Sequence, residues 1–179
     1  MSRPSPRLFA LLCALLVSQV EALPDDRNQP IRITADQALR DEKRGTTVYS
    51  GNVVMDQGSL HIEADRITIY RIVEDADKIV AEGDPVYMEQ QPEPEKPLMR
   101  ARARIIEYYK TEDRVHMRKD ARIEQDGATV SGNTIDYFIE QQLVKADSLS
   151  DQAGDRVEVL IPAGSISESE DSSGTAQGE

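Results

Sequence analysis

The chain has 179 residues, with 21 Lys and Arg against 33 Asp and Glu, and its formal net charge is −12 at pH 7. This acidic balance argues against general binding to nucleic acid or to an anionic membrane surface, because both carry negative charge themselves. The single cysteine excludes a fold that is held together by disulfides within the chain.

A cleaved signal peptide is predicted over residues 1–22. Two arginines precede the apolar run Leu8–Val17, which is shorter than the ~20 residues that span a bilayer. Small residues around Ala22 place the cleavage after it. The alternative is an uncleaved anchor, which the short apolar run disfavours. Cleavage removes Cys13, and it removes two basic residues and one acidic residue, so the net charge of the mature chain is about −13.

The rest of the chain carries strand signals, and no sustained helical stripe of apolar residues follows the signal peptide. Apolar and polar residues alternate in the stretches Ile31–Ala35, Val48–Met55, Leu60–Ala64, Arg66–Tyr70, Val115–Gln125 and Arg156–Ile161. Turn signals separate them at Gly45, Gly58, Gly83, Asp126–Gly127 and Asp151–Asp155. This spacing predicts one all-β domain over residues 23–162, built as a sandwich, barrel or roll.

The domain contains two similar halves, offset by 68 residues. Tyr49–Tyr70 and Met117–Phe138 each show two alternating strands around a glycine turn. The offset places Gln57 on Gln125, which begins the turn in each half. We interpret the halves as duplicates, although the regular rungs of any β-roll produce similar echoes.

Alternation also assigns the faces of the strands. Charged residues are rarely buried without a partner, so the uncharged phase is predicted to point inward. The inward set is Tyr49, Gly51, Val53, Met55, Leu60, Ile62 and Ala64 in the first half, and Val115, Met117, Ala121, Ile123 and Gln125 in the second. The phase slips by one residue at Asp65–Arg66, which predicts a bulge or corner, and Asn133 lies at the matching place.

No residues carry a catalytic or cofactor signature. His61 and His116 fall on the outward phase without ligand spacing, and a zinc site needs three or four converging ligands. We therefore predict neither an enzyme nor a metal site. The interior consists mainly of Val, Ile, Leu, Met and Ala, which fits a packed core and an apolar groove equally well. Residues 163–179 are small, polar and acidic, which predicts a disordered tail.

The motif G-N-V…Q-G…I-x-A-D spans Gly51 to Asp65, and the run "QPIRITAD" precedes it. With the weaker "GNTIDYF" of the second half, this pattern resembles the OstA-like family, and within it the periplasmic lipopolysaccharide-transport proteins. The similarity covers about Leu23 to Pro162. The second half departs from the motif, because Lys119–Asp120 replaces Gly51–Asn52.

The resemblance implies a single twisted, open-ended antiparallel β-jellyroll in the periplasm, whose interior holds the acyl chains of lipid A. Together with the alternation, it predicts an interior lined by Ile31, Ile33, Val53, Met55, Ile62, Val86, Met88, Tyr108, Ile123 and Val130. Arg71 and Lys78 are implied contacts of the phosphorylated head group, with a pair of solvated turn charges as the alternative.

The terminal strands Pro30–Ala35 and Arg156–Pro162 are predicted to lie at opposite ends of the roll, each with unpaired backbone groups. The predicted edge contacts are Ile31, Ile33, Val157, Val159 and Ile161. The resemblance implies three partners for these edges: further copies of the chain, an LptC-like inner-membrane protein and an LptD-like outer-membrane protein.

A secreted carbohydrate-binding β-module is the competing hypothesis. Such a module needs exposed aromatic rings that stack on sugars, and at least two of Tyr87, Tyr108, Tyr109 and Tyr137 would have to share an outer face.

Overall fold

The computed structural model describes residues 29–71, 76–91, 95–148 and 156–163. The predicted signal peptide and almost all of the acidic tail lie outside these ranges. The strands are β1 (Arg32–Thr34), β2 (Gln37–Asp41), β3 (Thr46–Gln57), β4 (Leu60–Arg71), β5 (Ala76–Gln90), β6 (Met99–Tyr109), β7 (Arg114–Gln125), β8 (Ala128–Phe138), β9 (Leu143–Asp147) and β10 (Glu158–Leu160). None of the described residues forms a helix that could cross a membrane.

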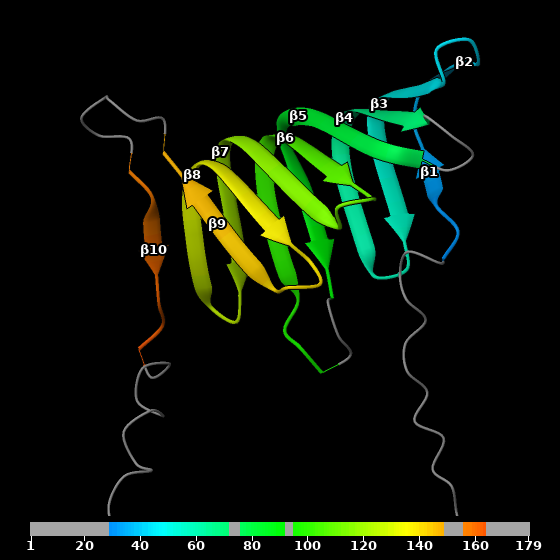
Figure 1. The fold of residues 1–179 in the computed structure, drawn as a ribbon. Coiled ribbons are helices and arrows are strands. Elements are labelled where there is room, and N and C mark those ends of the chain that lie inside the picture. The colour runs from blue at the N-terminus through cyan, green and yellow to red at the C-terminus, as the bar shows by residue number, and fades with distance from the viewer. Residues whose placement is uncertain (1–28, 72–75, 92–94, 149–155, 164–179) are drawn as a thin grey trace, which may run out of the picture.

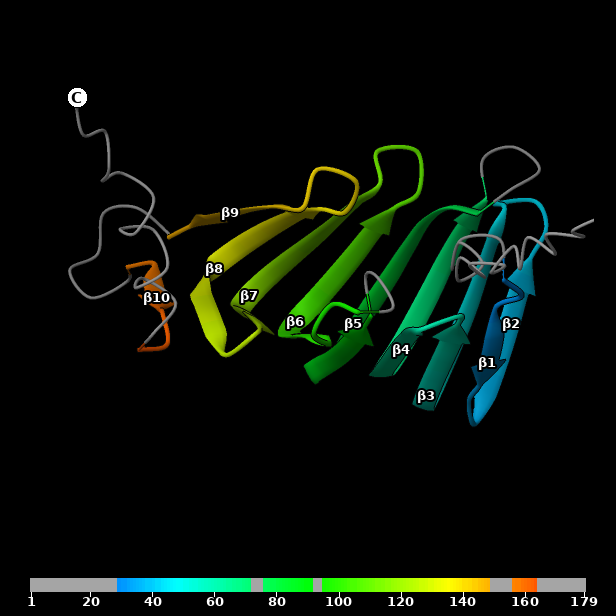
Figure 2. The ribbon, with the colours of Figure 1, turned by 90° about the horizontal axis from the view of Figure 1, so that it is seen from below.

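The strands form one open sheet (Figure 1). Its order is β1-β3-β4-β5-β6-β7-β8-β10, with β2 also paired to β3 and β9 also paired to β8. Every pairing is antiparallel. Figure 2 shows the strands side by side, from β1 and β2 at one end to β10 at the other. The predicted all-β, antiparallel and open-ended fold is confirmed.

Each long strand bends near its middle, along a line that we call the corner. The pairing register shifts there in every interior ladder, for example between Ser50 and Val53 on β3 and between Glu63 and Arg66 on β4. Bulges bend and twist a strand, so the corner divides the sheet into an arm that carries β1 and β10 and an arm that carries β2 and β9. The predicted slip at Asp65–Arg66 is confirmed.

Gly83 was predicted to mark a turn between strands, and this prediction is wrong. It lies inside β5, within the register shift between Glu82 and Val86. Glycine inside a strand commonly marks a bulge or a sharp bend. Gly83 therefore marks the corner of β5 and not a turn between two strands.

The duplication is confirmed by the pairing register. Met55 pairs with Ile62 in the first half, and Ile123 pairs with Val130 one 68-residue offset later. The register shift between Ser50 and Val53 recurs between Arg118 and Ala121 at the same offset. The two hairpins therefore share both their pairing and their bulge.

The core lies on the inner face of the bent sheet. The largest fully buried side chains are Met55, Ile67, Met88, Met99, Ile106, Met117, Ile135, Val53 and Val86. They belong to one hydrophobic cluster with members from both arms. The alternation had placed Val115, Met117, Ala121 and Ile123 inside, and all four are buried.

Candidate functional site

The inner face carries two continuous rows of side chains that cross the whole sheet. Residues directly opposite each other on paired strands point to the same face. The β1-arm row is Ile33, Met55, Ile62, Met88, Ala101, Ile123, Val130 and Val159. The β2-arm row is Ala38, Tyr49, Ile67, Ala81, Ile106, Met117, Ile135 and Ala146. Both rows are apolar from one end of the sheet to the other, apart from the hydroxyl of Tyr49.

Most predicted interior residues lie in or beside this core. Val53, Met55, Ile62, Val86, Met88 and Ile123 are at most 4% exposed. Ile33, Tyr108 and Val130 are partly buried and pack against the same cluster. Ile31 differs, because it precedes β1 and is 39% exposed. The ladder with β3 begins only at Arg32, so no opposite residue covers Ile31.

The two ends of the sheet present open edges. β1 pairs only with β3, and β10 pairs only with β8, among the described strands. The predicted edge residues Val157, Val159 and Ile161 are 37%, 56% and 54% exposed. Leu160 is 58% exposed and was not predicted, because it falls on the other phase of the alternation. Apolar side chains therefore stand free beside an unpaired backbone edge.

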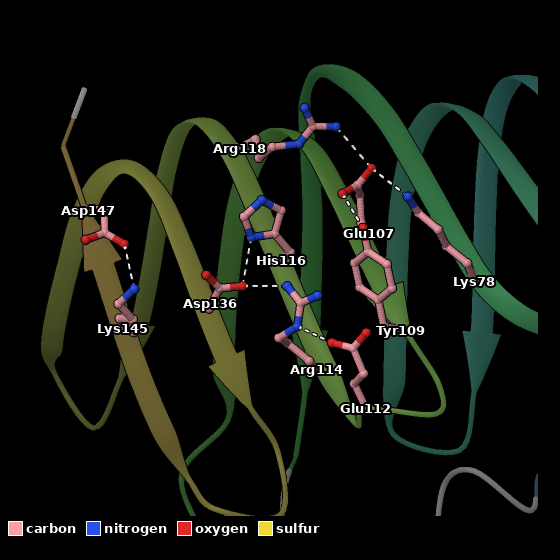
Figure 3. Close-up of polar contacts among 10 residues, drawn as sticks. All are labelled: Lys78, Glu107, Tyr109, Glu112, Arg114, His116, Arg118, Asp136, Lys145 and Asp147. Atoms are coloured by element: carbon pink, nitrogen blue, oxygen red, sulfur yellow. Dashed lines mark hydrogen bonds and ion pairs between the residues drawn. The ribbon is translucent and has the colours of Figure 1, made fainter. Parts of the chain in front are cut away.

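The outer face carries a polar network across β5, β6 and β7 (Figure 3). Glu107 is only 7% exposed. It accepts hydrogen bonds of 3.0 Å from Lys78 Nζ, Arg118 and the Tyr109 hydroxyl. Burial alone would raise the pKa of Glu107, but these donors and the charges of Lys78 and Arg118 outweigh burial and lower it. Glu107 is thus an ion held by three strands.

A second cluster continues the network to β8. Asp136 accepts from Arg114 at 2.7 Å and lies 2.8 Å from His116 Nδ1. These two partners outweigh burial and lower the pKa of Asp136. Arg114 also donates to Glu112 at 2.8 Å, and its guanidinium lies 4.4 Å from the ring centre of Tyr109. The alternation of the sequence placed Arg114, His116 and Arg118 on the outer face but predicted no contacts for them.

The histidines lie on the outer face, as the alternation predicted. His61 Nδ1 lies 2.7 Å from Asp56, and this contact raises the pKa of His61. His116 is engaged by Asp136. Among the described residues, no group of three or more His, Cys, Asp and Glu side chains could hold a metal ion.

The two predicted head-group residues lie close together where β4 ends and β5 begins. Arg71 ends β4, is exposed, and its backbone N–H donates to Gly45 O at 2.8 Å. Lys78 lies near the start of β5, where its ammonium binds Glu107 on the outer face and lies 4.7 Å from the ring centre of Tyr109. Tyr108, on the inner face, donates to Asp113 at 3.4 Å.

The four tyrosines do not form a shared outer platform. Tyr137 is 2% exposed in the core and Tyr108 packs against the core. Tyr87 and Tyr109 point outward but lie on different sides of the corner in β5 and β6. Lys78 and Arg114 already lie over the Tyr109 ring. This arrangement gives the carbohydrate-binding hypothesis no support.

In its described residues, this protein is an open antiparallel β-roll with an apolar interior and an unpaired strand edge at each end. A model of the family described as "LptA/(LptD N-terminal domain) LPS transport protein" matches residues 32–143. The chain belongs to this family. The resemblance drawn from the Gly51–Asp65 motif is thereby confirmed.

Several relatives in this family are named for lipopolysaccharide export. The chain is 39% identical over 142 residues to the lipopolysaccharide export system protein LptH of Pseudomonas aeruginosa, covering 79% of this chain and 81% of that protein. It is 32% identical over 143 residues to the export protein LptA of Haemophilus influenzae, covering 78% and 83%. It is 28% identical over 159 residues to LptA of Escherichia coli K12, covering 87% and 84%.

The fold also matches a solved relative. The crystal structure of LptH from Pseudomonas aeruginosa is described as the LptA homologous periplasmic component of the conserved lipopolysaccharide transport device. The TM-score is 0.72 at 34% identity, covering 78% of this chain and 99% of that chain.

Proposed function

We propose that this protein carries lipopolysaccharide through the periplasm, from the inner to the outer membrane. The acyl chains of lipid A lie along the inner face, and copies of the roll stack edge to edge to extend the path. The observation that carries this proposal is the β1-arm row, which is apolar across the whole sheet and ends at open edges. The names of the relatives support the same substrate.

The interior suits this cargo energetically. Shielding one twelve-carbon chain from water is worth on the order of 10 kcal/mol, at about 0.8 kcal/mol per CH₂. A lipid with several such chains therefore needs an apolar host throughout its passage. Because aliphatic contacts are non-directional, a row without polar interruptions lets a chain slide between equivalent positions.

The interior is also built from adaptable side chains. Met55, Met88, Met99 and Met117 account for four of the five methionines of the chain, and each is at most 1% exposed. Unbranched thioether side chains repack at low cost around irregular shapes. The packed interior can therefore admit an acyl chain by rearranging side chains, with the strands left in place.

The free edges support stacking by strand addition. Neighbouring strands are antiparallel along the eight-stranded path, so β1 and β10 run in opposite directions. β10 of one copy can thus pair in antiparallel sense with β1 of the next, and this heterologous contact builds a filament. An LptC-like protein at the inner membrane and an LptD-like protein at the outer membrane would occupy the two terminal edges.

Head-group recognition is proposed for Arg71 and Lys78, which lie where β4 ends and β5 begins. Their positive charge complements lipid A phosphates, and the chain is otherwise acidic. Tyr108, which lies on the inner face of the neighbouring strand β6, would contact the lipid just inside.

A competition experiment tests the proposal. Purified protein is mixed with an environment-sensitive fluorescent fatty acid, and lipid A or soluble glycans are added as competitors. We expect lipid A to displace the probe and glycans to have no effect. The matched variants are Ile33→Glu, on the inner face of β1, and Thr34→Glu, which adds the same charge on the outer face of that strand. Weaker lipid A binding by Ile33→Glu alone supports the proposal, and equal effects of both variants would contradict it.

A further inference from the structure

The edge formed by β1 and β2 crosses the corner with almost no intervening chain. β1 pairs with Val54–Asp56 of β3, and β2 pairs with Thr46–Ser50 of the same strand. Only Ala35 and Asp36 lie between them. The two short strands therefore act as a single edge that is bent at Asp36.

Asp36 is fastened to the corner of β3 by two hydrogen bonds. Its backbone N–H donates to Gly51 O at 2.9 Å, and Asn52 Nδ2 donates to Asp36 Oδ2 at 2.9 Å. Gly51 and Asn52 both have positive φ, at 80° and 45°. A Cβ at Gly51 would collide with the Asp36 carboxylate. The backbone of β3 is thus shaped to receive this side chain.

This contact matters more on an edge strand than it would inside the sheet. Interior strands are held across the corner by ladders on both sides, whereas among the described strands β1 and β2 pair with β3 alone. Asp65, at the corner of β4, makes no side-chain hydrogen bond or ion pair with another described residue. The opposite edge differs as well, since residues 148–157 separate β9 from β10.

We propose that Asp36 is a positioning residue for stacking: it holds β1 and β2 in line, so that an incoming copy can add along both arms at once. This inference rests on the proposed edge-to-edge stacking and names Asp36 as a residue on which the stacking depends. Without the contact, either short strand still pairs with β3, but the two no longer present one continuous edge. Asp36 touches no lipid in this account.

Two binding assays separate the two edges of the protein. In the first assay, the test variant also carries Val159→Pro, which blocks its β10 edge. This protein is titrated against immobilised wild type, so that binding reports on the edge formed by β1 and β2. In the second, the test variant has a free β10 edge, and it is titrated with the Val159→Pro protein. Urea unfolding of each variant verifies that it is folded.

We expect Asp36→Ala to weaken binding about fivefold in the first assay, which is the loss of roughly one hydrogen bond, and to leave the second assay unchanged. Asn52→Ala should reproduce this result. Asp36→Asn, which keeps an oxygen for Asn52, should restore binding, and Asp65→Ala should match wild type in both assays.

Equal binding by Asp36→Ala and wild type in the first assay would overturn the role of Asp36 and leave stacking intact. Equal losses in both assays would overturn it too, because a general structural defect affects both edges. If wild type itself fails to bind in either assay, edge stacking is wrong and the inference falls with it.

Discussion

Lys119 takes the backbone position in β7 that Gly51 takes in β3. The φ of Lys119 is 63° and that of Gly51 is 80°, and the residues after them, Asp120 and Asn52, are also left-handed. Residues with a Cβ rarely adopt this conformation, because the Cβ approaches the following carbonyl oxygen. The second half therefore keeps the bulge of the first although it has lost the glycine that favours it.

Replacing Lys119 by Gly should stabilise the protein. Glycine relieves the left-handed strain at an exposed position, and its greater freedom in the unfolded state offsets part of the gain. We expect the free energy of unfolding to rise by about 0.5–1 kcal/mol in a urea titration. Gly51→Ala should instead lose about 1–3 kcal/mol, because it adds strain and its Cβ meets Asp36. Equal effects of the two variants would contradict the equivalence of the bulges.

The sequence predicted the faces of the strands well and the corner in part. Alternation placed Met55, Ile62 and Ile123 inside because period-two patterns report directly on burial. The slip at Asp65 revealed the bend, but Gly83 was misassigned because a bulge and a turn favour the same residue. In the second half, Lys119 and Asp120 replace the glycine and asparagine of the first-half bulge, so the sequence showed no sign of the bend in β7 that the ladder preserves.

The outer network was beyond sequence reasoning for a different reason. The burial of Glu107 depends on Lys78 from β5, Arg118 from β7 and Tyr109 from its own strand, β6. Only the pairing register of the strands brings these side chains together. Leu143–Asp147 has too few apolar alternations to predict β9, which forms because β8 offers it an edge. Tertiary context decides both cases.

Glu107→Gln should destabilise the protein at neutral pH by on the order of 2 kcal/mol, because Lys78 and Arg118 lose their shared carboxylate. The pKa of Glu107 is lowered in the folded state, so its contribution is complete above the unfolded value of about 4.3 and is lost as pH falls through the folded value. Urea unfolding should therefore show the full difference at pH 7 and a smaller one at pH 3, which lies below the unfolded value. Glu89→Gln, which removes an exposed pair with Arg100, is the control and should change stability by less than about 0.5 kcal/mol. A difference that persists undiminished at pH 3 would disprove the charge-based explanation.

Arg71→Gln and Lys78→Gln should separate lipid recognition from stability. We expect both changes to weaken binding of lipid A at low salt, because each removes a positive charge near the strand ends where the phosphates are proposed to bind. Only Lys78→Gln should also lower the free energy of unfolding, since Lys78 neutralises Glu107. Dephosphorylated lipid A serves as the control ligand and should bind both variants as it binds wild type. If the double variant binds phosphorylated lipid A like wild type, the head-group role is wrong.

Val159→Pro should abolish growth of the assembly without unfolding the subunit. Proline removes a backbone donor and obstructs strand addition, while β10 contributes only three exposed residues to the sheet. Scattering should show wild-type particles that lengthen with concentration and variant particles that do not. A folded variant that lengthens like wild type would refute stacking through this edge.

Site-specific photo-crosslinking tests whether lipopolysaccharide travels along the inner face of the sheet. A photoreactive amino acid is placed at Ile33 or Met88 on the inner face, or at His61 or His116 on the outer face, and each protein is irradiated with lipopolysaccharide. We expect labelled adducts at Ile33 and Met88, which belong to the β1-arm row, and none at the histidines. Equal labelling at all four positions would contradict transport along the inner face.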